Sequence, residues 1–377
     1  MLEELLANPW IAFLFVVAGG VALVMGGEWL VRGASSIALG LRISPLVVGL
    51  TIVALCTSAP EMAVSFSSVL RAGAEGAKEV ANVAIGNVVG SNICNILLIL
   101  GCCAMIRPLR AQELVVRRDF PIYVVIAVAT CALAFPFVRE GGAHYFPRWL
   151  GALFLLAFIV YELVAIKQAR REENANHVAN VVDVVVPDAV PRGLSAPLRA
   201  TANAKGLEET TAIAQETTPE QNGAKTNWPL AIAQVLFGLA ALVVGSRFFV
   251  DGAVSVARAI GVSELVIGLT LVALGTSLPE LTVSAVATYR NQVDVALGNV
   301  VGSCICNIVL ILGGTLLLVP GGLDLEKQTV FVDLPVMVAA GGIAAWFCLT
   351  DRKLERWEGA ILLLMQAGYA AYLVYFA

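Results

Sequence analysis

Long apolar blocks alternate with short polar connections along this chain, and the pattern predicts a membrane protein. Each block holds about 20 or more residues with few charges, the length that a helix needs to cross about 30 Å of hydrocarbon. Five blocks precede residue 168 and five follow residue 227, so we predict an all-α fold of ten transmembrane helices. The predicted spans are 9–31, 44–70, 80–105, 119–139, 147–167, 228–250, 262–288, 293–318, 329–350 and 356–376.

A polar segment separates the two groups of spans. Residues 168–227 are rich in Ala, Asn, Thr, Glu and Pro and show no sustained periodicity. Such a composition buries too little apolar surface to order itself, so we predict a disordered linker, with a short strand over 181–186 as an alternative. The predicted organisation is a five-helix unit over 1–167, the linker over 168–227 and a second five-helix unit over 228–377.

Two sequence blocks occur once in each half of the chain. The first is SPLVVGLTIVALCTSAPE at Ser44–Glu61, which returns as SELVIGLTLVALGTSLPE at Ser263–Glu280 with 13 of 18 positions identical. The second is AIGNVVGSNICNILLIL at 84–100, which returns as ALGNVVGSCICNIVLIL at 296–312 with 14 of 17 positions identical. The two halves are therefore copies of one helical unit.

An odd number of spans in each half places the second copy upside down in the membrane. If the N-terminus is outside, the inside connections hold 17 Lys and Arg residues and the outside connections hold seven. Because basic residues favour the cytoplasmic side, we predict that both termini lie outside and that the linker is cytoplasmic. Inverted repeats are typical of secondary transporters, whose sites lie near the midplane where the copies meet. A cation channel built in this way stays an alternative.

Composition narrows the chemistry of such a site. Hydrophobic residues make up 59% of the chain and charged residues 14%, so the net charge of −4 says little about partners. The two histidines, His144 and His177, lie outside the predicted spans, which disfavours a His-based metal site. The eight cysteines lie in apolar segments, which argues against a disulfide framework.

No phosphate-binding GxxxxGK[ST] loop is present in the sequence, and this disfavours an ATP-driven pump. We expect no enzymatic activity, no cofactor, no nucleic-acid partner and no obligate protein partner. The expected partners are the lipid bilayer and the transported ions.

Glu61 and Glu280 are the strongest chemical signal in the sequence. Each lies deep in an apolar span, and both occupy the same position in their repeats. A charge at the centre of a membrane helix costs roughly 2.5 to 3.5 kcal/mol. No Lys or Arg lies at comparable depth in the four repeated spans, so a proton or a metal cation is expected to supply the positive charge. Two neutral carboxylic acids that bond each other are the structural alternative.

Each glutamate follows a Thr-Ser-x-Pro sequence. The proline removes a backbone hydrogen bond and is expected to free carbonyls about one turn earlier. A proline alone would make a simple kink, but its repeated combination with hydroxyls and a carboxylate indicates hard oxygen ligands, which suit Ca²⁺ and Na⁺. The candidate ligands in these segments are Ala54, Thr57, Ser58 and Glu61 in the first repeat and Ala273, Thr276, Ser277 and Glu280 in the second.

The second repeated block is expected to form the opposite wall of the site. Its glycines have small-xxx-small spacing, which lets helices approach closely, and packing alone would account for them. Polar residues four apart in the same block share one helix face. The polar residues predicted to line the site are Ser91, Asn95, Ser303 and Asn307.

The charges favour an exchange reaction. Two carboxylates balance one Ca²⁺ or two Na⁺, so the same oxygens can serve either ion in turn, as an antiporter requires. Any further Na⁺ would use neutral oxygen ligands and would make transport electrogenic.

The repeated blocks resemble the two α-repeats of the calcium/cation antiporter superfamily, in particular its prokaryotic sodium/calcium exchanger branch. The matching residues are GLTIVALCTSAPE with GLTLVALGTSLPE, and GNVVGSNICN with GNVVGSCICN. The resemblance covers nearly the whole chain apart from the linker, and it implies a ten-helix fold with four central ion-binding helices and two long tilted helices that slide to alternate access.

The resemblance also implies roles for the candidate residues. It implies Ca²⁺ ligands at Glu61 and Glu280, with further oxygens from Thr57, Thr276 and the carbonyls of Ala54 and Ala273. It implies that the Na⁺ sites are completed by Ser58, Ser277, Ser91, Ser303, Asn95 and Asn307.

Three positions depart from the family pattern. Cys56 stands where the repeat has glycine, as at Gly275, and Ala59 replaces the usual leucine. Asn307 stands where some exchangers, including potassium-dependent ones, carry aspartate, which weakens the case for potassium co-transport. The GNVVGS block lacks the acidic residue of the proton/calcium branch, which favours sodium. We therefore predict a Na⁺/Ca²⁺ antiporter of a prokaryotic cytoplasmic membrane, with H⁺/Ca²⁺ exchange as the alternative.

Overall fold

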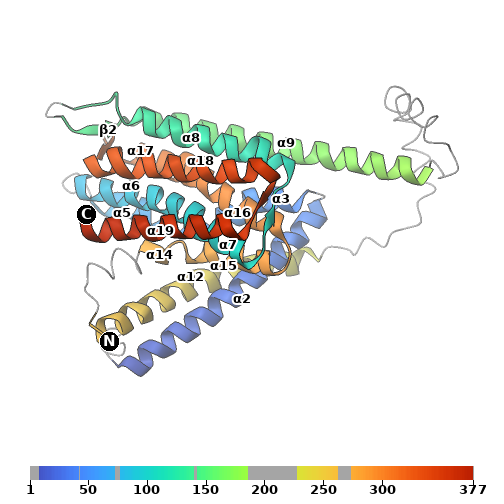
Figure 1. The fold of residues 1–377 in the computed structure, drawn as a ribbon, viewed down its shortest axis with the longest axis horizontal. Helices are drawn as coiled ribbons and strands as arrows, with labels where there is room; N and C mark the ends of the chain where they lie inside the picture. The colour runs from blue at the N-terminus through green and yellow to red at the C-terminus, as the bar shows by residue number, and fades with distance from the viewer. Residues whose placement is uncertain are drawn as a thin grey trace.

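The computed structural model describes residues 8–41, 43–72, 77–139, 142–185, 227–261 and 273–376. These residues form a helical bundle with two short strand pairs, and the N- and C-terminal ends lie at the same end of the bundle (Figure 1). The predicted all-helical membrane fold is confirmed.

The two halves contain matching series of helices. In the first half these are α2 Pro9–Leu41, α3 Pro45–Val48, α4 Ala54–Thr57, α5 Ala59–Ala72, α6 Ala77–Cys94, α7 Leu100–Ile106, α8 Phe120–Leu133 and α9 Trp149–Val185. In the second half they are α12 Trp228–Ala259, α14 Ala273–Gly275, α15 Leu278–Tyr289, α16 Val293–Cys306, α17 Gly313–Leu318, α18 Leu334–Asp351 and α19 Arg356–Phe376.

Short π-helical turns join several of these pieces into longer helices. Two pairs of turns occupy equivalent positions in the two halves, which is a further sign of repetition. The turns are Gly49–Val53, Asn95–Ile99, Val115–Asp119, Asn307–Leu312 and Thr329–Asp333.

Seven helices of the described chain are long and apolar enough to cross a membrane, and the bent pair α4–α5 adds an eighth candidate. The predicted span at 119–139 corresponds to α8 with the π-helical turn before it. The predicted span at 262–288 is described only from residue 273, as α14 and α15, because 262–272 lie outside the described residues. Exposed tryptophans, which favour the membrane–water interface, stand at the starts of four helices; they are Trp10, Trp149, Trp228 and Trp357.

The helices that carry the second repeated block lie at the centre of the bundle. In the most apolar stretch of Val83–Ile106, 72% of the residues are buried, and in Val293–Leu318 the share is 83%. The corresponding shares are 28% in Trp10–Leu41 and 33% in Trp228–Ala259. The polar faces predicted to line a site therefore belong to the two most enclosed helices.

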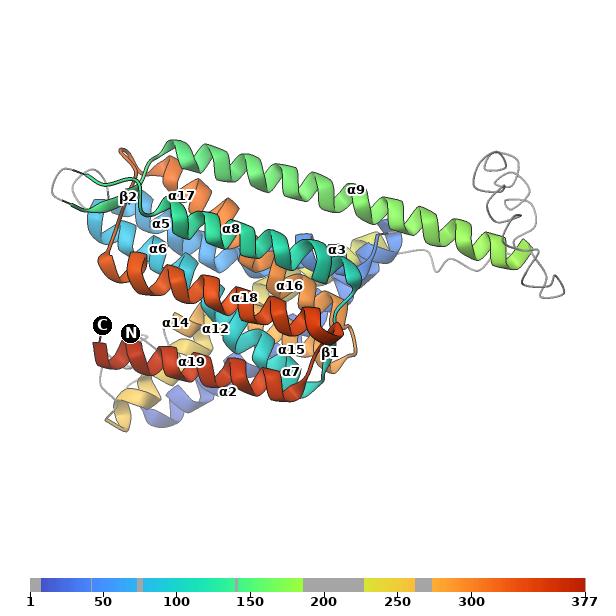
Figure 2. The same cartoon turned by 45° about the horizontal axis from the view of Figure 1, so that its top comes forward.

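The long helices α2 and α12 cross the bundle obliquely, side by side (Figures 1 and 2). They have 33 and 32 residues, so the predicted ends at 31 and 250 were too early. Glu28 and Arg32 pair with each other one turn apart within α2.

Glycines spaced seven residues apart let α2 and α12 approach backbone to backbone. A Cβ atom on Gly26 would lie 2.8 Å from the carbonyl oxygen of Gly238, and one on Gly19 would lie 2.7 Å from that of Gly245. A Cβ atom on Gly252 would lie 2.6 Å from the carbonyl oxygen of Ala12. The two helices thus form one tightly joined pair.

The strands confirm that the repeats are inverted. β1 Leu109–Arg110 follows α7, and its counterpart β3 Leu323–Leu325 follows α17. β1 pairs antiparallel with β4 Lys353–Leu354, and β3 pairs with β2 His144–Phe146. The β1 and β2 labels stand at opposite ends of the bundle (Figure 2). Equivalent strands therefore lie at opposite ends, as two copies of opposite orientation require.

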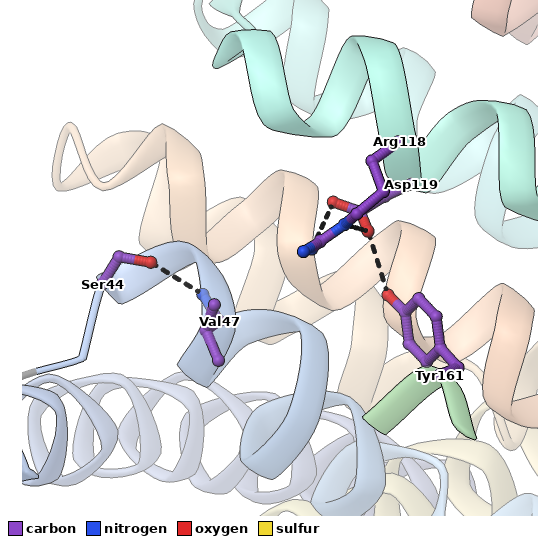
Figure 3. Close-up of polar contacts among 5 residues, drawn as sticks. All are labelled: Ser44, Val47, Arg118, Asp119 and Tyr161. Carbon is purple, nitrogen blue, oxygen red and sulfur yellow. Dashed lines mark hydrogen bonds and ion pairs between the residues drawn. The ribbon is translucent and has the colours of Figure 1, made fainter. Parts of the chain in front are cut away.

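An aspartate joins the fourth and fifth helices of each half, fully buried at Asp119 and half-buried at Asp333. Asp119 accepts hydrogen bonds from Arg118 (2.7 and 3.0 Å) and from the hydroxyl of Tyr161 on α9 (3.3 Å; Figure 3). In the second half, Tyr369 on α19 donates to Asp333 at 3.0 Å. Figure 3 also shows Ser44, which accepts from the amide of Val47 and caps the start of α3.

α9 continues well beyond the predicted end of its span at residue 167. It ends at Val185, so the stretch considered for a short strand is helical up to that residue, and the helix projects from the bundle (Figure 2). Residues 186–226 lie outside the described residues. Residues 168–185 are helical rather than disordered, so the disordered linker stays a prediction only for 186–226, as do the domain boundaries.

Candidate functional site

The two glutamates lie just after breaks in equivalent helices. Leu46–Thr57, which ends with α4, forms a bent pair with Ala59–Leu70 of α5 at an angle of 43°, and Ser58 in the break has a φ of −79° and a ψ of 5°. Ser277 in the second repeat has almost the same backbone, with a φ of −89° and a ψ of 4°. Glu61 and Glu280 then fall in the first turns of α5 and α15, where the helix dipole favours a negative charge.

Each carboxylate is bonded by a serine of the other repeat. The Ser58 hydroxyl donates to Glu280 Oε1 at 3.0 Å, and the Ser277 hydroxyl donates to Glu61 Oε1 at 3.4 Å. Both glutamates are 1% exposed. The crossed bonds bring the two repeats together at one place, and they differ from the alternative in which the two carboxylic acids bond each other.

The second oxygen of each carboxylate is buried without a hydrogen-bond partner among the described residues. These atoms are Glu61 Oε2 and Glu280 Oε2. An unpaired buried carboxylate is costly, because removal from water is not offset by any protein contact. A bound cation would supply that contact, so the residues present fit a cation site.

The threonines predicted as ligands adjoin the same pair of glutamates. The Thr57 hydroxyl lies 3.3 Å from the carbonyl of Ala54 and 3.0 Å from Asn299 Oδ1. The Ala54 carbonyl also accepts the backbone amide of Ser58 at 3.0 Å, so the proline does not leave it without a partner. A carbonyl oxygen has two lone pairs, however, and one stays available to a ligand. Ala273 begins α14 immediately after residues 262–272.

Of the serines and asparagines of the second block, Ser91 contacts a residue of the crossed pair, and the other three stay predicted site residues. The hydroxyl oxygens of Ser91 and Ser277 lie 3.4 Å apart. Ser303 Oγ and both amide atoms of Asn95 and Asn307 are buried, and in the described part of the chain they have no hydrogen-bond partner. Both asparagines begin π-helical turns, a local structure that is frequent at functional sites.

In the second copy of this block the glycines allow the helices to approach closely, as predicted, whereas a Cβ atom on Gly86 or Gly90 in the first copy would meet no described atom within 4 Å. A Cβ atom on Gly298 would lie 2.7 Å from the carbonyl oxygen of Leu46, and one on Gly302 would lie 2.6 Å from that of Leu50. The second block therefore serves packing as well as the site.

Four further polar residues belong to this region beyond the predicted set. Asn87 and Asn299 lie one turn before the predicted serines on α6 and α16, and Ser65 and Ser284 lie one turn after the glutamates. Asn87 Nδ2 donates to Ser65 at 3.0 Å, and Asn299 Nδ2 donates to Ser284 at 2.9 Å. Their identical positions in the two repeats were the available signal.

A pocket of about 590 Å³ adjoins one half of the site. Its walls come from α5, α12 and α14, and they include Pro60, Gly275 and Thr276. The remaining lining residues run along α5 to Ser67 and along α12 to Asp251, the directions that lead to the end of the bundle where the termini lie. The pocket gives one half of the site a path toward that end.

The chemistry of the site differs from that of a transition-metal site. Within the described ranges, no group of three or more His, Cys, Asp and Glu side chains is arranged to hold a metal ion. Two carboxylates surrounded by hydroxyl, amide and carbonyl oxygens provide a hard ligand set of the kind that Ca²⁺ prefers.

Comparison with known proteins agrees with this chemistry. The profile of the family described as sodium/calcium exchanger protein matches residues 11–167 and 230–377, once over each half. The chain is 32% identical to the sodium/calcium exchanger MaX1 of Methanosarcina acetivorans, over 96% of this chain and 98% of MaX1. It is 31% identical to the inner membrane protein YrbG of Escherichia coli, over 90% of this chain and 89% of YrbG.

A solved structure of the sodium-calcium exchanger NCX_Mj, soaked with Na⁺ and Sr²⁺, has the same fold. The TM-score is 0.69 at 26% sequence identity, and the match covers 96% of this chain and 97% of NCX_Mj. Since the family profile matches both inverted halves that meet at the crossed glutamates, this chain is a transporter, not an enzyme, and belongs to the sodium/calcium exchanger family.

Proposed function

We propose that this protein is a secondary antiporter that exchanges Ca²⁺ for Na⁺ across the cytoplasmic membrane by alternating access. The observation that carries the proposal is the crossed pair in which Ser58 bonds Glu280 and Ser277 bonds Glu61. Within the described residues neither glutamate forms an ion pair with a lysine or arginine. Two carboxylates then balance one Ca²⁺ or two Na⁺, so that one ion can replace the other without leaving a net charge.

The proposed ligands follow the two repeats. Glu61 and Glu280 would bind Ca²⁺, together with hydroxyl and carbonyl oxygens from the residues before each proline. MaX1 and NCX_Mj are both named as sodium/calcium exchangers, and this supports Na⁺ as the counter-ion. The full set of proposed ion-binding residues is Ala54, Thr57, Ser58, Glu61, Ser91, Asn95, Ala273, Thr276, Ser277, Glu280, Ser303 and Asn307.

The proposed topology has both termini outside the cytoplasm and residues 168–227 inside it. The excess of Lys and Arg in the inside connections supports it. With that topology, the pocket beside Thr276 faces the extracytoplasmic side. The E. coli relative is named as an inner membrane protein, which supports the same membrane here.

Reconstituted vesicles test the coupling. Purified protein in proteoliposomes loaded with Na⁺ is expected to take up ⁴⁵Ca²⁺ when external Na⁺ is removed, and to stop when the gradient is dissipated. Uptake driven equally well by a pH gradient in sodium-free buffer would favour H⁺/Ca²⁺ exchange. A dependence on K⁺ would show potassium co-transport, and uptake without any internal counter-ion would show a channel.

The same assay tests the linker. Deletion of a moderate part of 186–226 is expected to leave exchange largely intact, because we propose that this segment is a tether. Loss of exchange in a deletion variant that still inserts into the membrane would assign the segment a role in transport.

A further inference from the structure

Asn87 and Asn299 also join the two repeats beside the glutamates. Asn299 on α16 contacts α15 of its own repeat and Thr57 on α4 of the other repeat. Asn87 on α6 makes the same contacts with α5 and with Thr276. The same contacts occur in both repeats, so they are a property of the repeated unit and not of one local packing environment.

The backbone fixes the direction in which each asparagine amide points. Asn299 Nδ2 lies 3.4 Å from the carbonyl oxygen of Glu280, and Asn87 Nδ2 lies 3.2 Å from that of Glu61. A carbonyl oxygen only accepts hydrogen bonds, so the amide group that faces it must be the NH₂ donor. The amide oxygens therefore face Thr57 and Thr276.

This orientation decides what the threonine hydroxyls do. An amide oxygen only accepts, so Thr57 must donate its single hydroxyl hydrogen to Asn299 Oδ1 when the 3.0 Å bond forms. The hydrogen is then not used on the Ala54 carbonyl, which lies 3.3 Å away. Both the Thr57 oxygen and the Ala54 carbonyl keep lone pairs that can contact a cation.

We propose that Asn299 and Asn87 are positioning residues that hold the hydroxyls of Thr57 and Thr276 as cation acceptors. Each takes the hydroxyl hydrogen of the partner repeat and anchors itself on the first turn of the glutamate helix in its own repeat. The position of the threonine oxygen relative to the carboxylate is thus fixed, and the Ala54 carbonyl does not accept the hydroxyl hydrogen of Thr57. This inference rests on the proposed function, since it assigns how the same ions are bound.

A double-mutant cycle on Ca²⁺ binding tests the proposal. Equilibrium dialysis with ⁴⁵Ca²⁺ measures the dissociation constant for purified full-length protein and for Asn299→Ala, Thr57→Val and the double variant. Loss of one oriented hydrogen bond is expected to weaken binding by roughly three- to tenfold in Asn299→Ala. The double variant is expected to bind no more weakly than Thr57→Val, because Asn299 acts through the Thr57 hydroxyl.

Two outcomes would overturn the proposal. One is multiplication of the two single effects in the double variant, which would mean that Asn299 acts independently of Thr57. The other is an unchanged dissociation constant in Asn299→Ala with a lower fraction of folded protein, which would mean a structural role. If Asn299→Ala does not fold, the cycle is carried out with Asn87→Ala and Thr276→Val, whose side chains are only half-buried.

A matched control comes from the same helix. Asn92 on α6 is buried and donates to the carbonyl of Val88 at 2.7 Å, and its counterpart in the second repeat is Cys304. Asn92→Cys is therefore expected to leave the dissociation constant for Ca²⁺ unchanged. Equilibrium dialysis measures Ca²⁺ binding without a sodium gradient. A failure of Na⁺-driven uptake would therefore contradict the proposed coupling, while the double-mutant cycle would still decide the positioning role.

Discussion

The two halves of the site have the same residues and the same hydrogen bonds but different surroundings. Thr57 and Asn299 are completely buried, and the bond between them is 3.0 Å. Thr276 and Asn87 are half-buried, their bond is 3.5 Å, and Thr276 lines the 590 Å³ pocket. The chemistry is symmetric, and the access to it is not.

The long helices α2 and α12 account for this difference. α2 packs on α15, where a Cβ atom on Gly27 would lie 3.2 Å from Thr282 Cγ2. Glu28 on α2 also pairs with Arg290 just after α15. On the other side, α12 stands off from α5 and leaves the pocket between them. An alternating-access carrier needs equivalent ligands from both repeats and a scaffold that exposes the site to only one side of the membrane at a time.

Replacing either glutamate by glutamine is expected to have the largest effect. Glu61→Gln and Glu280→Gln each leave one carboxylate to face a divalent cation, and an unbalanced buried charge lowers Ca²⁺ uptake more than about a hundredfold. Proteoliposome uptake measures the loss, with membrane insertion checked by protein recovery. If one variant keeps near-normal uptake, the two carboxylates are not equivalent and the site assignment is wrong.

Cysteine labelling measures the difference in access directly. Thr276→Cys is expected to react with a hydrophilic thiol reagent several times faster than Thr57→Cys, because only Thr276 lines the pocket. Both variants are made in a background without the half-buried thiols Cys56, Cys102 and Cys131. Equal labelling rates at the two positions would contradict the asymmetric access.

The ion pair on the closed side is expected to have a smaller effect. Arg290→Gln removes one partner of Glu28, whose side chain is 30% exposed, so stability should change by less than about 1 kcal/mol. The labelling rate of Thr57→Cys in the Arg290→Gln protein should nevertheless rise, because α2 is held less firmly on α15. An unchanged rate would show that packing at Gly27 closes this side without the ion pair.

The smallest effect on Ca²⁺ uptake is expected from Gly275→Cys, which gives the second repeat the residue that the first repeat has at Cys56. Gly275→Cys would place a Cβ atom 2.8 Å from Val250 Cγ2 on α12, so the Val250 side chain, which lines the pocket, must shift. Uptake should fall by about twofold, the usual scale for a tolerated substitution. A loss as large as that of the glutamate variants would mean that the wall of the pocket is as essential as the carboxylates.

The sequence was sufficient to predict the glutamates and the inversion. Glu61 and Glu280 could be recognised because a charge in an apolar span needs compensation, and because the same position carries it twice. The inversion followed from an odd number of spans per half and from the basic residues. These signals are local or repeated, so they can be read without knowledge of the contacts.

The contacts across the site could not be predicted in the same way. Asn87 shares a helix face with Ser91, but its bond to Thr276 joins residues 189 positions apart. The strand pairs have the same difficulty, since β1 and β4 have only two residues each and belong to different halves. The ends of α2 and α12 were placed too early, because both helices continue past their most apolar stretch.

The glycines of α2 and α12 have a mechanical consequence. Where backbones touch, as at Gly26 with Gly238 and Gly19 with Gly245, no flexible side chain stands between the helices to absorb a displacement. If α2 tilts away from α15, α12 must then move with it as one rigid body, toward α5. Opening on the α15 side and closing on the α5 side would then be coupled directly by the α2–α12 pair, without a conformational change passing through the ion site.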